Sequence, residues 1–252
     1  MQGYSPGFSR LYNLRWGGFA QYAASHILDF YAATATVPNK AHILDLCCGT
    51  GQFARCCLEQ GYAVTGIDLS EAMLKYAQEN TAAYIQSGQA QFICANAGAF
   101  ALKARFGLVV STFDALNHLA DETALQSCFK RVFAVCDGYF IFDLNTPVGL
   151  RQWNNLQVDD AKEDAFILSR GIYDGQPGSK AWTRITGFVR NADGTYERVD
   201  ETAYNTVFDL AWVKQTLLEI GWQDVYAARL QDLKTPLAEP EKEGRVFFVA
   251  RR

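Results

Sequence analysis

Short apolar runs alternate with longer segments of helical periodicity through the middle of the chain. The runs are too short for helices and are rich in β-branched and aromatic residues, which predicts buried strands of a parallel sheet. They are HILDLC (42–47), YAVTGID (62–68), AQFICA (90–95), FGLVVST (106–112) and GYFIFDL (138–144). Helices are predicted between most of them, near residues 52–60, 70–84 and 121–136. This alternation predicts a doubly wound, Rossmann-like α/β sheet.

The pattern differs on both sides of this central region. The segment from Phe8 to Ala35 is aromatic-rich and is predicted to be helical, so residues 1–39 form a helical cap. After the fifth strand the sequence has three extended segments, joined by the turn-forming sequences GQPGS and NADG, at 165–174, 181–191 and 195–208. Residues 148–208 are therefore predicted to be an inserted antiparallel β-meander.

The α/β pattern returns after the insertion. A helix near 209–220 is followed by strands at WQDVYAA (222–228) and RVFFVAR (245–251). Together with the five strands above, they predict a seven-stranded sheet whose core spans residues 40–147 and 209–252.

Composition and charge narrow the classes of function. With 252 residues, 49% of them hydrophobic, the chain is large enough to bury a core. The formal charge is −4 and the 23 Lys and Arg residues are scattered, so we expect no nucleic-acid binding. No apolar run is long enough to cross a bilayer, and the start MQGYSPGFSR lacks the apolar centre of a signal peptide. We therefore expect no membrane association and a cytoplasmic location.

The seven cysteines do not form a metal-binding pattern. Cys47 and Cys48 are adjacent, as are Cys56 and Cys57, and only three His residues are present to complete a ligand set. We therefore predict that the cysteines are small buried apolar residues, with no metal site and no structural disulfide.

The turn after the first strand has the spacing of a nucleotide-binding turn. Gly49, Gly51 and Ala54 satisfy the loose G-x-G-x-x-G/A pattern, and Asp68 ends the second strand, where a carboxylate can bind ribose hydroxyls. These residues fit a dinucleotide, so an NAD(P)-dependent oxidoreductase is one hypothesis. Asp45, just ahead of the turn, would repel a pyrophosphate but attract an ammonium or sulfonium group. The turn therefore favours a cationic ligand.

ILDLCCGTGQFA (43–54) resembles the first motif of class I S-adenosylmethionine-dependent methyltransferases, and VTGIDLSEAML (64–74) is similar to the second. The likeness continues in order through FICANAGAF, FGLVVSTFDALNHL and YFIFDLNTP, and covers about residues 40–147. Cys47 stands where the family usually has Gly, so either its side chain points away from the methionine part of the cofactor or the loop opens slightly. Asn96 stands where the family often has Asp; its amide can still meet the adenine edge.

The resemblance implies S-adenosylmethionine as cofactor, S-adenosylhomocysteine as product, and a set of cofactor-binding residues. These are Tyr12, Trp16, Asp45, Cys47, Cys48, Gly49, Gly51, Asp68, Leu69, Met73, Asn96, Ala97, Thr112 and Phe113. Asp45 would lie near the amino group and Asp68 at the ribose, while Leu69 and Met73 would enclose the adenine. For Met73, and for Tyr12 with Trp16, ordinary core packing remains an alternative.

The candidate catalytic residues follow the fourth and fifth strands. Methyl transfer is accelerated mainly by orientation, and a base is needed only when the acceptor arrives protonated. His118 is the candidate base and Asn117 a polar positioner, although a His in an apolar helical context is more often structural. Asn145, at the carboxyl edge of the sheet, is predicted to contact the substrate.

The insertion bears on the acceptor. Its position resembles that of small-molecule methyltransferases acting on amines or amino sugars, such as glycine N-methyltransferase, which implies a small, polar or amine-bearing acceptor. In a regular strand one face carries Trp182, Arg184, Thr186, Phe188 and Arg190. We predict that this face covers the acceptor as a lid. The alternative is a partner surface, in a homodimer or in a non-catalytic regulator that binds S-adenosylmethionine; the chain would be a monomer or a homodimer.

Overall fold

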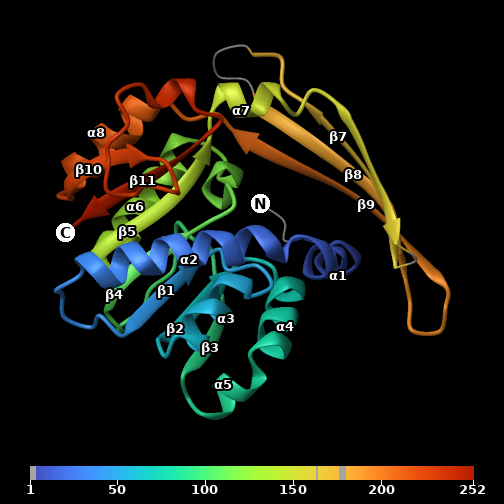
Figure 1. Ribbon diagram of the computed structural model, residues 1–252, viewed down its shortest axis with the longest axis horizontal. Coiled ribbons are helices and arrows are strands. Elements are labelled where there is room, and N and C mark those ends of the chain that lie inside the picture. Colours follow the sequence, from blue (N-terminus) through green and yellow to red (C-terminus); the bar gives the residue numbers. More distant parts are fainter. Residues whose placement is uncertain (1–3, 163, 176–179) are drawn as a thin grey trace.

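The structure is a computed structural model that describes residues 4–162, 164–175 and 180–252. Its main sheet has seven strands in the order β10-β11-β5-β4-β1-β2-β3 (Figure 1). The strands are β1 (His42–Leu46), β2 (Ala63–Asp68), β3 (Ala90–Cys94), β4 (Phe106–Ser111), β5 (Cys136–Asn145), β10 (Gln223–Ala228) and β11 (Arg245–Arg251). β11 runs antiparallel to both of its neighbours, β10 and β5, and the other pairs in this sheet are parallel. The predicted Rossmann-like sheet is confirmed.

Helices cover both faces of the seven-stranded sheet (Figure 1). One face packs against α6 (Glu122–Val135) and α8 (Leu210–Ile220), and the other against α2 (Gly17–Thr34) and α3 (Gln52–Glu59). Short 3-10 helices, η1 (Ala115–His118) and η2 (Pro240–Lys242), lie in two of the loops. No helix within the described ranges combines the length and apolarity needed to span a membrane.

The predicted helix near 70–84 is two helices, α4 (Glu71–Asn80) and α5 (Ala82–Gln86). Ser70 caps the start of α4 by accepting the Met73 N–H at 3.3 Å. Thr81 separates the two helices, and its hydroxyl donates to the Ala77 carbonyl at 2.7 Å. A β-branched residue that bonds back to the preceding turn favours a break, which the apolar period alone does not reveal.

The N-terminal segment is helical, as predicted, but it also divides in two. α1 (Pro6–Arg15) ends before α2 because Trp16 leaves the helical conformation and two glycines follow it. The break lets α1 turn away from the seven-stranded sheet and lie beside the inserted strands (Figure 1).

The insertion follows β5, as predicted, and forms a second, antiparallel sheet in the order β6-β7-β8-β9. It consists of α7 (Pro147–Arg151), β6 (Leu156–Lys162), β7 (Ala165–Ile172), β8 (Lys180–Arg190) and β9 (Tyr196–Thr206). The sequence predicted three extended segments, so β6 is a fourth that was missed. The NADG sequence forms the β8–β9 turn, with Gly194 at φ 84°. Residues 176–179, in the predicted GQPGS turn, lie outside the described residues.

The orientation of β8 corrects one prediction. Trp182, Arg184, Thr186, Phe188 and Arg190 do share a face, but it points outward, and Phe188 is 46% exposed. The alternate positions are small or apolar; two of them, Ile185 and Val189, are buried against α1 together with Phe8 and Leu11. This face of smaller, uncharged residues is therefore the inner one, because it can pack without leaving charges buried.

Candidate functional site

The turn between β1 and α3 is built from left-handed backbone. Gly49 and Gly51 have φ of 52° and 75°, and a Cβ on Gly51 would lie only 2.9 Å from the Ala77 Cβ. Cys47 also has a positive φ, 61°, and packs against the hydrophobic cluster that includes β4 and α6. Burial raises the pKa of its thiol well above the usual value. The turn thus keeps an open backbone with no large side chain on it.

Asp45 lies beneath this turn. Its side chain is almost fully buried, and Oδ2 accepts the Ala54 N–H of α3 at 3.1 Å. Burial raises the pKa of its carboxyl to about 7, outweighing the opposite effect of that hydrogen bond. In the free protein the group is therefore poised between neutral and charged near pH 7, so a cation bound beside it would favour the charged form.

Asp68 joins the end of β2 to the turn. Its Oδ2 accepts the Gly49 N–H and its Oδ1 the Ser70 N–H, both at 2.8 Å. Burial raises the pKa of this carboxyl as well, while the backbone N–H groups of Ser70, Gly49 and Leu69 act in the opposite direction. Each oxygen keeps a lone pair, so the carboxylate can still accept a hydrogen bond from a ligand.

The residues predicted around an adenine differ in exposure. Leu69 is half-buried, whereas Met73 is only 1% exposed and packs with α1 in a hydrophobic cluster. Asn96 is exposed and its Oδ1 accepts the Gly98 N–H at 2.7 Å, while Ala97 is buried in the core. The structure therefore places Met73 in the core and leaves the amide nitrogen of Asn96 for other partners.

Aromatic side chains lie over the glycine turn. Tyr12 Cε1 would be 3.8 Å from a Cβ on Gly49, and the Tyr12 ring centre is 6.0 Å from that of Phe113. Burial, and the nearby Asp114, raise the pKa of the Tyr12 hydroxyl well above its usual value. Trp16 packs on Tyr12 and Phe8 in the cluster under α1. Tyr12 thus lies between the turn and the loop after β4.

The loop after β4 is strained. Phe113 and Asp114 have φ of 66° and 48°, a conformation that costs about 1–3 kcal/mol for a residue with a side chain. The half-buried Thr112 precedes them, and η1 follows. Such backbone persists only where other contacts hold it.

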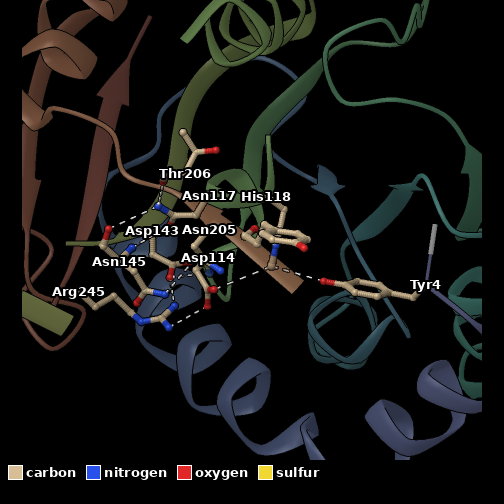
Figure 2. Close-up of polar contacts among 10 residues, drawn as sticks. Tyr4, Asp114, Asn117, His118, Asp143, Asn145, Asn205, Thr206 and Arg245 are labelled. Atoms are coloured by element: carbon tan, nitrogen blue, oxygen red, sulfur yellow. Dashed lines mark hydrogen bonds and ion pairs between the residues drawn. The ribbon is translucent and has the colours of Figure 1, made fainter. Parts of the chain in front are cut away.

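Asp114, Asp143 and Arg245, which we call the Arg245 cluster, supply those contacts (Figure 2). Asp143 Oδ2 accepts the Asp114 N–H at 2.9 Å, and the Arg245 guanidinium donates to Asp114 Oδ1 at 2.9 Å and to Asp143. The guanidinium lies 4.9 Å from the Phe19 ring centre and 5.7 Å from that of Phe113. No motif in the sequence pointed to Arg245, since it opens β11, far from the loop that it holds.

Asn117 and Asn145, the predicted positioner and substrate contact, both have buried side chains that bond within the protein. The Asn117 side chain is buried, accepts the Asn145 N–H at 2.9 Å and donates to the Thr206 carbonyl at 2.9 Å (Figure 2). Asn145 is buried too, and its amide nitrogen lies 3.5 Å from Asn205 Oδ1. These amides tie η1 and β5 to the end of β9.

His118 has one ring nitrogen bound to the backbone and one beside Tyr4 and Asp114. Its Nδ1 is 2.8 Å from the Tyr204 carbonyl oxygen, which can only accept, so Nδ1 carries a hydrogen and, in the neutral ring, Nε2 keeps a lone pair. Nε2 is 3.5 Å from the Tyr4 hydroxyl and 4.0 Å from Asp114 Oδ2, and the side chain is 25% exposed (Figure 2). The arrangement can accept a proton beside a carboxylate. Tyr4 and Asp114 were not identified from the sequence.

Comparisons with known proteins agree on one activity. Residues 43–137 match a family model described as a methyltransferase domain. A protein named as a methyltransferase, from Geobacillus sp. (strain WCH70), is 31% identical over 220 residues, 83% of this chain and 84% of that protein. The dTDP-3-amino-3,6-dideoxy-alpha-D-glucopyranose N,N-dimethyltransferase of Streptomyces fradiae is 32% identical over 98 residues, 38% of this chain and 36% of that one.

A solved structure extends the likeness to the whole fold. It is the crystal structure of an S-adenosylmethionine-dependent methyltransferase from Clostridium acetobutylicum ATCC 824. Its TM-score is 0.77 at 20% identity, and the match covers 97% of each chain. The second sheet is therefore included in the similarity.

Proposed function

We propose that this chain, which belongs to the class I S-adenosylmethionine-dependent methyltransferases, methylates the nitrogen of a small amine-bearing acceptor. The enzyme uses S-adenosylmethionine as methyl donor. His118 Nε2, which lies 3.5 Å from the Tyr4 hydroxyl, carries the proposal, because an ammonium acceptor must lose a proton before its nitrogen can attack. The Streptomyces fradiae relative, named as a methyltransferase of an amino sugar, supports an amine as the acceptor.

The residues of the turn fit this cofactor. Its positively charged sulfur supplies an already activated methyl group, so the protein contributes mainly binding and orientation. Asp68 would accept the ribose hydroxyls, Asp45 would lie near the ammonium, and Tyr12 would cover the methionine part. One buried hydroxyl of the turn, Thr50 Oγ1, has no hydrogen-bond partner in the structure. A ligand in the turn can supply one.

Asp45 predicts a pH dependence of cofactor binding. Because burial raises the pKa of its carboxyl to about 7, the group is mostly protonated below that pH and must ionise to meet an ammonium. Affinity for S-adenosylhomocysteine should therefore fall, by up to about tenfold per pH unit, as the pH drops below 7. Adenosine, which lacks the ammonium, is the control ligand in calorimetry. Asp45→Asn should remove the difference in pH dependence between S-adenosylhomocysteine and adenosine. If the difference persists, a group other than Asp45 causes it.

We also infer that the second sheet and α1 together close the acceptor side of the site, through the inner face of the sheet. Ile185 and Val189 of that face bury Phe8 and Leu11 of α1, whose Tyr12 lies over the turn. The insertion would thus act as a lid by holding α1 in place rather than by offering its aromatic and basic face.

The outer face of β8 gives a contrasting prediction. Arg184 forms two hydrogen bonds with Asp200 on that exposed face, at 2.8 and 2.7 Å. Arg184→Ala should leave the KM for an amine acceptor unchanged, because the side chain points away from the site. Steady-state kinetics, with thermal unfolding as the control for folding, test this. A large rise in KM would show that the outer face of β8 contributes to acceptor binding.

The proposed function is tested by screening primary and secondary amines, including amino sugars, amino acids and alkylamines, for S-adenosylhomocysteine release. The same compounds with hydroxyl in place of the amine are the controls. Release with amines alone supports the proposal, and release with hydroxyl compounds alone refutes it.

A further inference from the structure

We propose that Asp114 binds the ammonium group of the acceptor, and that Arg245 and Asp143 are positioning residues that hold Asp114 for this task. The inference rests on the proposed function and adds to it the residue that selects the acceptor.

Asp114 offers one free oxygen to the site. Its Oδ1 accepts from Arg245 at 2.9 Å, while Oδ2 faces Nε2 of His118 at 4.0 Å. When the neutral His118 ring carries its hydrogen on Nδ1, its Nε2 is an acceptor, and so is Asp114 Oδ2. The two atoms therefore cannot form a hydrogen bond with each other. One nitrogen about 2.9 Å from each atom would satisfy both. A group with two N–H bonds is the matching donor.

The local charge also favours a cation. Arg245 is the only cation in the Arg245 cluster and Asp114 and Asp143 are its two carboxylates, so the cluster carries one net negative charge when all three are ionised. Asp114 and Asp143 are buried, and Asp143 Oδ1 has no hydrogen-bond partner. A buried excess charge is costly, and an ammonium beside Oδ2 would offset it. Tyr4, the other polar side chain near Nε2, is a neutral donor.

The backbone of Asp114 has a left-handed conformation that a residue with a side chain rarely adopts. Two consecutive left-handed residues, Phe113 and Asp114, turn this carboxylate toward His118. The Asp143 carboxylate fixes the Asp114 N–H, and the Arg245 guanidinium fixes Oδ1 while stacking near Phe113. Strain that three contacts maintain is typical of a residue placed for binding.

The placement gives a route for the acceptor's proton. One N–H of the bound ammonium donates to Asp114 Oδ2 and another faces His118 Nε2. When that second N–H bond breaks, the proton forms a bond to Nε2 and the electron pair stays on the acceptor nitrogen. The imidazolium formed lies 4.0 Å from Asp114 Oδ2, which stabilises its charge. A hydroxyl has only one hydrogen and cannot donate to both acceptors, so the site selects primary and secondary amines.

Asp114→Asn tests the inference, because it keeps the shape and the oxygen bonded to Arg245 but removes the charge. With the most active amine of the screen, at a pH where that amine is charged, we expect the KM to rise about tenfold to a hundredfold. Affinity for S-adenosylhomocysteine should be unchanged. Asp200→Asn, an equivalent change on the outer face, should alter neither.

Arg245→Met provides a second measurement, since it releases Asp114 while leaving its charge. The KM should rise again, and Arg245→Lys should restore part of the loss. An unchanged KM in Asp114→Asn and Arg245→Met, with amines still turned over, refutes this inference alone. If no amine is turned over, the proposed function fails and this inference fails with it. Equal losses of cofactor affinity and acceptor KM would show that the cluster only maintains the fold.

Discussion

Asp68→Ala is expected to weaken binding of S-adenosylhomocysteine about a hundredfold or more in calorimetry. The carboxylate can accept two hydrogen bonds from ribose hydroxyls, each worth about 1.5–3 kcal/mol when the acceptor is charged. It also accepts the Gly49 and Ser70 N–H groups, so its loss releases the turn that faces the cofactor. Both effects reduce affinity.

Asp68→Asn separates these contributions. The amide keeps one acceptor oxygen but cannot accept at both positions, so its loss of affinity should lie between those of the wild type and Asp68→Ala. Thermal unfolding without ligand checks that both variants fold. If folded Asp68→Ala binds S-adenosylhomocysteine as tightly as the wild type, Asp68 does not contact the cofactor.

His118→Gln is expected to lower kcat/KM for an amine about 10²–10⁴-fold near pH 7, the usual effect of losing a general base. Glutamine retains polar atoms but cannot take up the proton. The loss should shrink as the pH approaches the ordinary pKa of an alkylamine, about 10, because the acceptor then arrives deprotonated. Cofactor affinity should stay nearly unchanged, since His118 is not among the predicted cofactor contacts.

A structural role for His118 gives a different pattern. Its Nδ1 bond to the Tyr204 carbonyl joins η1 to β9, and loss of that bond would lower stability at every pH. A reduction in kcat/KM that is independent of pH, accompanied by a lower Tm, would contradict the role of base.

The sheet could be predicted from the sequence because its signals are local. Buried parallel strands have continuous apolar runs, and Ser70, Asp121 and Asp209 cap helices that start where the period changes. β6 was missed because LQVDDAK is largely polar and lacks the β-branched run of the other strands. The face of β8 was assigned wrongly because aromatic residues suggested an interior, whereas packing chose the smaller apolar residues.

The site shows the same division between local and distant signals. The glycine turn, Asp45 and Asp68 follow one another along consecutive elements, so the motif predicts their proximity. Arg245 reaches Asp114, 131 residues earlier in the chain, only because β11 pairs antiparallel with β5. Asn117 was predicted to have a catalytic role because its hydrogen bonds to β9 and β5 cannot be seen in the sequence. They depend on how the inserted sheet returns to the core.

The central claim, methyl transfer to an amine nitrogen, is tested most directly by identifying the product. A matched pair of acceptors, D-glucosamine and D-glucose or the best amine of the screen and its hydroxyl counterpart, is incubated with S-adenosylmethionine and analysed by mass spectrometry. We predict that only the amine gains a methyl group, on nitrogen, with one S-adenosylhomocysteine released for each methyl transferred. Methylation of the hydroxyl compound, or of a carbon or oxygen of the amine compound, would contradict the account.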